Sequence, residues 1–143
     1  MMGIIFSIIA GAAMSFQGVI NTRLGEKVGL YEANAFVQGT AFILALIAML
    51  VLGKGNIREI VSTDKIYLTG GILGLIITIT VMLGIKDLSP LISISIILVS
   101  QLTVAALIDA FGLLGSEQIK IGFTKILGFV LMVAGVILFK VKT

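Results

Sequence analysis

Carboxamide and hydroxyl side chains are the groups best suited to bind a ligand in this 143-residue chain, because the sequence contains no Cys and no His. The absence of those two residue types excludes disulfide frameworks, thiol nucleophiles, imidazole bases and the commonest zinc ligands. With most catalytic chemistries removed, we expect no enzyme, no metal site and no cofactor. The polar groups that remain can recognise a small molecule through hydrogen bonds.

Two pairs of carboxamides stand one helical turn apart in the first part of the chain. Gln17 and Asn21 form one pair, and Asn34 and Gln38 form the other. At this spacing two amides lie at neighbouring depths on one side of a helix, and each offers both donors and an acceptor. They could hold a polar substrate. They could equally bond neighbouring helices, which is a common use of Asn and Gln in membranes, and the two roles are compatible.

Further polar side chains extend this predicted substrate pathway into the rest of the chain. They are Thr78, Ser100 and Gln101. Asp109 follows Gln101 by eight residues, which is about 80° around an ideal helix and about 12 Å along it, so the two share a broad face. The pathway therefore predicts a site of amide and hydroxyl groups without a central charge.

Three charged residues at the ends of apolar segments are candidates for coupling or ion pairing: Asp109, Glu32 and Arg23. A carboxylate close to a membrane span is costly unless it is hydrated or paired, which makes Asp109 the leading ionisable candidate. The alternative is that Asp109 marks a helix end at the lipid headgroups, with Arg23 or a Lys as its partner. Glu32 could likewise be a hydrated interfacial acid.

These residues must be positioned by helices that cross a membrane. Hydrophobic residues make up 59% of the chain and charged residues 12%, whereas a soluble domain is about half apolar and about a quarter charged. A span needs roughly 20 apolar helical residues to match a ~30 Å hydrocarbon core. We expect an all-α integral membrane protein, a single domain over 1–143 with five spans. The predicted spans are 3–22, 33–52, 66–85, 89–109 and 121–139.

Small residues and turn signals indicate how these spans pack and where they begin. Glycines predicted at helix contacts are Gly11, Gly18, Gly39, Gly70, Gly74, Gly128 and Gly135. Ser89 suits an N-cap and Pro90 the first position of a helix. Residues 56–61 could form one amphipathic turn on the headgroups. The fifth span has no uncharged polar side chain between Ile126 and Phe139, so we expect it at a packing or dimer contact.

The basic residues are balanced across the membrane if all five spans cross. One side would hold Lys54, Arg58, Lys65, Lys120 and Lys125. The other side would hold Arg23, Lys27, Lys86, Lys140 and Lys142. Because Lys and Arg asymmetry sets orientation, five against five predicts insertion in both directions, although one dominant loop could still decide it. The charges form no patch suited to nucleic acid.

Several segments resemble one transporter family. Gln17-Gly18, Asn21 and Gly39 look like the first half of the YdcZ-like family of the drug/metabolite transporter superfamily, and Gly70-Gly71-Ile72-Leu73-Gly74 resembles its third helix. The most specific match is Ser100-Gln101 followed by Asp109-Ala110-Phe111-Gly112, with Ser100 where the family pattern usually has Gly. The resemblance implies one half of an inverted-repeat transporter, and it carries over Gln17, Asn21, Gln101 and Asp109 as site residues.

From this resemblance we expect a multi-pass protein of the prokaryotic cytoplasmic (inner) membrane. The leading hypothesis is a secondary-active or facilitative transporter, an exporter of small polar or amphipathic metabolites or drugs. Two copies would pair as an antiparallel homodimer and work by alternating access. The alternative is a non-transporting membrane subunit that pairs with an oppositely oriented paralogous half.

Overall fold

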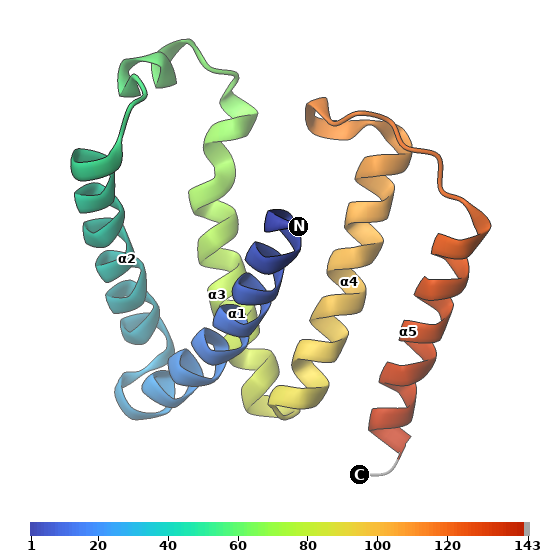
Figure 1. Ribbon diagram of the computed structural model, residues 1–143. Coiled ribbons are helices and arrows are strands. Elements are labelled where there is room, and N and C mark those ends of the chain that lie inside the picture. Colours follow the sequence, from blue (N-terminus) through green and yellow to red (C-terminus); the bar gives the residue numbers. More distant parts are fainter. Residues whose placement is uncertain (142–143) are drawn as a thin grey trace. The chain divides into compact units, whose positions relative to one another are not determined.

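The computed structural model describes residues 1–141, and all regular structure in that range is helical. Its five α-helices are α1 (Met2–Val28), α2 (Leu30–Leu52), α3 (Gly70–Asp87), α4 (Pro90–Phe111) and α5 (Phe123–Val141) (Figure 1). Three short 3-10 helices, η1 (Ile57–Ser62), η2 (Lys65–Thr69) and η3 (Leu113–Gly115), lie in the connections. The chain divides into two compact units, one from Met1 to Asp87 and the other from Leu88 onwards.

Four helical segments are long and apolar enough to cross a membrane. They are α1, α2, the continuous stretch Lys65–Asp87, and α4. The apolar part of α5, Phe123–Phe139, is shorter, and its 17 residues rise about 25 Å against a ~30 Å hydrocarbon core. The all-helical fold is therefore confirmed for the described residues, and the fifth span stays a prediction. Lys142, which enters the charge balance, lies outside the described residues, as does the side chain of Lys140.

Helices α1 and α2 are joined by a single residue, Gly29, whose φ is 106°. Positive φ is accessible to glycine at little cost. The amide of Gly29 donates to the Gly25 carbonyl, and the Gly29 carbonyl accepts from Ala33 N–H, so both backbone groups of Gly29 are bonded, one to each helix. Helix α1 continues past Thr22, where the predicted span ends, to Val28, and Arg23 and Glu26 form an ion pair of 3.0 Å one turn apart along this extension.

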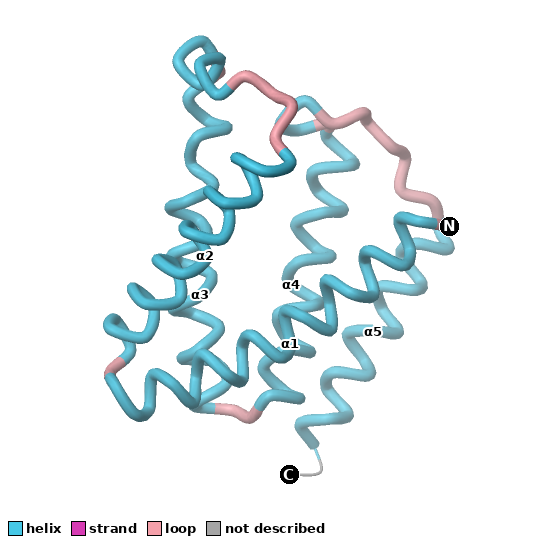
Figure 2. The backbone as a smooth tube through the Cα atoms, turned by 60° about the vertical axis from the view of Figure 1, so that its left-hand side comes forward, coloured by secondary structure: helices cyan, strands magenta, loops and turns pink. Residues whose placement is uncertain are grey.

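Glycines on α1 allow the close approach of α3. A Cβ at Gly18 would come 2.8 Å from Ile85 Cδ1, and one at Gly25 would come 2.6 Å from Met82 Cε. Both views of the backbone show the N-terminal half of α1 diverging from α2 and α3, so only its C-terminal half packs in this unit (Figures 1 and 2). The buried centre of the first unit consequently lies near the α1–α2 turn.

The connection between α2 and α3 contains two exposed 3-10 helices. The Asn56 side chain accepts a hydrogen bond from Arg58 N at 3.1 Å, and that of Asp64 accepts one from Ile66 N at 3.4 Å. These caps start η1 and η2 respectively. Residues 57–61 of the amphipathic turn expected over 56–61 are therefore helical, as part of η1, and Ile57 is 60% exposed; a position on the headgroups stays a prediction.

Helix α4 of the second unit begins as predicted, with Ser89 as N-cap and Pro90 in the first turn. The Ser89 hydroxyl accepts from Ile92 N at 3.5 Å. The helix ends at Gly112, whose φ is 61°, and the chain then folds back so that Ile119 N donates to the Asp109 carbonyl at 2.8 Å. Helix α5 packs against α4.

Large apolar side chains cover the outside of the helices. Leu50 is 73% exposed and Leu138 is 70% exposed. Such surfaces are unfavourable in water and are normal where hydrocarbon is the solvent.

Candidate functional site

Three polar side chains lie in the buried centre of the first unit, which is otherwise apolar. Asn21 and Thr22 on α1 are each 5% exposed, and Asn34 on α2 is 2% exposed. The buried apolar residues of that unit are Ala33, Met82 and Ile85. We call Asn21, Thr22 and Asn34 the buried polar cluster. It combines two carboxamides and one hydroxyl and contains no charge.

Thr22 and Asn34 of the buried polar cluster differ in whether their side-chain oxygens have hydrogen-bond partners. Thr22 Oγ1 donates to the Gly18 carbonyl at 2.7 Å and lies 3.5 Å from the Met82 carbonyl on α3. Asn34 Oδ1 has no partner among the described residues. A buried polar group without a partner costs about 1–3 kcal/mol of stability. The buried position of Asn34 therefore lowers the stability of the described fold.

A second polar contact links α2 to α3 one turn from Asn34. Gln38 Nε2 donates to Thr78 Oγ1 at 3.3 Å, and Thr78 Oγ1 donates to the Gly74 carbonyl at 2.8 Å. Both side chains are part-buried. The structure thus brings Gln38 and Thr78 together, as two members of the pathway predicted from the sequence, and Asn34 stands on the same helix at the adjacent turn.

Gln17 lies apart from the buried polar cluster although it is one turn before Asn21. Its side chain is exposed. Residues four apart on a helix are offset by about 40°, which is enough to separate a buried from an exposed position at the edge of a contact. Gln17 therefore reaches the site only if another chain or a ligand comes to this face of α1.

The candidate residues of the second unit lie along α4. Ser100 and Gln101 are exposed, and Asp109 is partly exposed in the last turn of the helix. Within its own unit, Asp109 makes no ion pair with a described side chain. Its backbone carbonyl accepts a hydrogen bond from Ile119 N in the connection that follows α4. Each of the two units therefore contains some of the predicted pathway residues.

Arg23 and Glu32 occupy the end of the first unit near the α1–α2 turn. Arg23 pairs with Glu26 in an exposed contact, and a surface pair of this kind contributes about 0–1 kcal/mol. Glu32 lies in the first turn of α2, where a negative charge is favoured by the helix dipole. Both positions fit an interfacial location.

The predicted packing glycines fall into two groups. Gly18 meets α3 closely, and a Cβ at Gly74 would lie 3.9 Å from Gln38 Nε2. A Cβ at any of the others would meet no atom of its own unit within 4 Å; these are Gly11, Gly39, Gly70, Gly128 and Gly135. Their contacts stay a prediction that needs lipid or another chain. Gly25, which was not among the predicted packing glycines, makes one of the closest approaches; its spacing of seven from Gly18 was the available signal.

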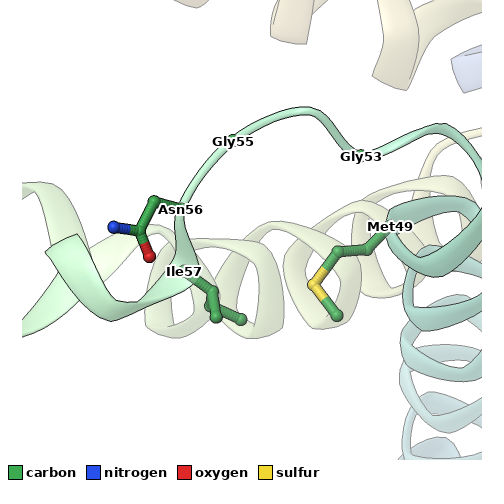
Figure 3. Close-up of a pocket in the computed structure, with 5 residues that line it drawn as sticks. All are labelled: Met49, Gly53, Gly55, Asn56 and Ile57. Carbon is green, nitrogen blue, oxygen red and sulfur yellow. The ribbon is translucent and has the colours of Figure 1, made fainter.

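A pocket of about 430 Å³ lies outside this region, at the end of α2. It is lined by Met49, Gly53, Gly55, Asn56 and Ile57 (Figure 3). None of these side chains is charged. Among residues 1–141 no three acidic, His or Cys side chains gather as metal ligands would, so the polar cluster and the Gln38–Thr78 contact are the strongest candidates for a binding site in the first unit.

Comparison with known proteins identifies the family. The model of a family described as "Putative inner membrane exporter, YdcZ" matches residues 2–138. No curated protein and no solved structure matches the chain significantly. The match covers nearly the whole length, and four helices have the length and hydropathy of membrane spans. The chain is therefore a multi-pass inner membrane protein that belongs to the YdcZ-like family of transporters in the drug/metabolite transporter superfamily.

Proposed function

We propose that this chain is a secondary-active or facilitative exporter of small polar or amphipathic metabolites or drugs. The observation that carries the proposal is the presence of hydrogen-bonding groups between otherwise apolar helices: the buried polar cluster and the Gln38–Thr78 contact. Polar groups inside a membrane bundle are costly and commonly mark a substrate route. Because the buried groups of the first unit carry no charge, neutral recognition by amides and hydroxyls is favoured.

The working unit is an antiparallel homodimer. Five spans enclose a poor pathway alone, whereas two oppositely oriented copies reproduce the inverted repeats of many secondary transporters. The equal division of Lys and Arg between the two sides supports insertion in both orientations. Alternating access then arises when the two copies rock around a site between them.

Two matched double variants test this assembly. Lys120→Gln with Lys125→Gln removes two positive charges from one side, and Lys140→Gln with Lys142→Gln removes two from the other. Each pair biases insertion toward one orientation, and the two biases are opposite. Each variant alone should lose the dimer and transport, and coexpression of the two should restore both.

The readouts are co-purification of differently tagged copies and uptake of a panel of small amines, alcohols and amphipathic cations into reconstituted vesicles. Full activity of either variant expressed alone would contradict the antiparallel homodimer. A panel that crosses no faster than through protein-free vesicles would contradict transport. If the wild-type protein is stable only with a different chain, it is a subunit that pairs with an oppositely oriented paralogous half.

A further inference from the structure

The Asn34 carboxamide requires a hydrogen-bond donor that the described chain does not supply. Its side chain is 2% exposed, and Oδ1 has no partner among the described residues. Oδ1 is an acceptor, so its missing partner must carry an N–H or O–H group. Asn34 lies within α2, past the start of the helix, where backbone N–H groups bond along the helix.

Gln38 has a hydrogen-bond partner on α3, whereas Asn34 Oδ1 has none among the described residues. On α3, Thr78 Oγ1 accepts the hydrogen bond from Gln38, and Met82, one turn further along, is fully buried. A thioether has no hydrogen to donate. The Thr22 hydroxyl of the buried polar cluster directs its proton to backbone carbonyls. Neither of these residues therefore donates to Asn34 Oδ1, and no other described group does so.

We infer that Asn34 Oδ1 accepts a hydrogen bond from the transported molecule, which rests on the proposed function above. The substrate class is then a small compound with an N–H or O–H donor next to an apolar body. Ala33, Met82 and Ile85 are the buried apolar residues of the same unit, and the Asn21 amide of the buried polar cluster carries a further donor and acceptor. A buried water could present the same O–H chemistry, and the experiment separates the two sources.

The first arm measures stability without any substrate. Asn34→Leu removes a polar group that has no partner, so it should raise the Tm of the purified protein. Gln38→Leu is the matched control on the same helix, and because it breaks a hydrogen bond to Thr78 it should lower the Tm. A lower Tm for Asn34→Leu would show that Asn34 has a partner in the assembled protein, and the inference would be wrong.

The second arm measures binding with two matched pairs of probes. One pair is 2-phenylethylammonium and its N-trimethyl derivative; the other is 2-phenylethanol and its methyl ether. In each pair only the first molecule has a donor. A donor-bearing probe should raise the wild-type Tm more than its blocked analogue, and Asn34→Leu should weaken its binding about tenfold or more.

Equal shifts from both members of both pairs, or no shift from any probe, would overturn the substrate role and assign the donor to water. Transport is scored separately, as flux of the same probes into reconstituted vesicles. Donor-dependent binding without flux would leave the Asn34 inference intact and refute the proposed function. If Asn34→Leu leaves the flux unchanged, the proposed function stands and the Asn34 inference is wrong.

Discussion

Helix α3 carries two threonines whose hydroxyls have different surroundings. Thr78 bonds its own helix and also accepts from Gln38 on α2, whereas the exposed Thr80 bonds only the carbonyls of Ile76 and Ile77 on its own helix. A hydrogen bond between membrane helices contributes about 0.6 kcal/mol on average. The same residue type therefore serves an interhelical contact at one position and the helix alone at the other.

Thr78→Val should lower stability by about 0.5–1.5 kcal/mol because Gln38 Nε2 loses its acceptor. Thr80→Val is the matched control and should change stability by less than about 0.5 kcal/mol. Reversible unfolding in mixed micelles measures both. With Gln38→Leu, a double-mutant cycle should give a positive coupling energy for Gln38 and Thr78. Additive effects of the two changes would contradict the contact.

Asp109, in the last turn of α4, is the leading carboxylate candidate for coupling transport to a proton gradient. If its proton exchange drives export, Asp109→Asn should abolish the dependence of transport on a pH gradient while downhill flux continues. Flux into reconstituted vesicles with and without an imposed gradient measures this. Glu117→Gln, in the exposed connection that follows α4, is the control and should behave as wild type. An unchanged gradient dependence in Asp109→Asn would remove Asp109 from coupling.

At the scale of helices, the one-residue connection between α1 and α2 is the most demanding turn in the first unit. Gly29 has a φ of 106°, and a Cβ there would collide with the Glu32 carboxylate. Gly29→Ala should therefore destabilise the protein by about 1–3 kcal/mol. Gly70→Ala is the control, because Gly70 has helical dihedral angles and open space around it, and it should be neutral or slightly stabilising.

Thermal unfolding of the two glycine variants provides the measurement. Equal Tm values for Gly29→Ala and Gly70→Ala would show that the turn can relax without cost. A loss of stability in both would place Gly70 at a contact with another chain, as its predicted packing role requires.

The positions of the helices followed from the sequence because charges are costly in hydrocarbon and apolar stretches must be about 20 residues long. The start of α4 at Ser89 and Pro90 followed from capping chemistry. Which side of each helix is buried was harder to predict, because lipid and protein both accept apolar side chains. Gln17 and Asn21 were predicted on one side of the first helix, yet only Asn21 is buried.

The candidate site followed from the sequence only in part. The one-turn spacing of Asn34 and Gln38 placed both on the side of α2 that enters the bundle. The spacing did not distinguish Gln38, which bonds Thr78, from Asn34, whose Oδ1 has no partner among the described residues, because that difference depends on which groups the neighbouring helices bring to each amide. Such pairings are properties of tertiary packing and require coordinates.

At the scale of the whole molecule, orientation in the membrane decides how many copies build the transport path. Single cysteines can report it cleanly, since the chain has no native Cys. Ser62→Cys lies in the exposed η1 helix, and Thr143→Cys places a thiol at the C-terminus. If all five helices cross, these two positions face opposite sides. A membrane-impermeant thiol reagent is applied to intact cells and then to permeabilised cells.

In a dual-topology protein, each cysteine should label to about half in intact cells, because five basic residues on each side give the insertion machinery no preference. In a protein of fixed orientation, one cysteine should label fully and the other only after permeabilisation. Full labelling of both in intact cells would mean that both positions face the outside, so an even number of helices would cross between them. That result would exclude α5 as a span and leave the four longer helices as the membrane domain. An even-span chain of that kind would need a different explanation for its balanced charges, since its two ends would share one side of the membrane.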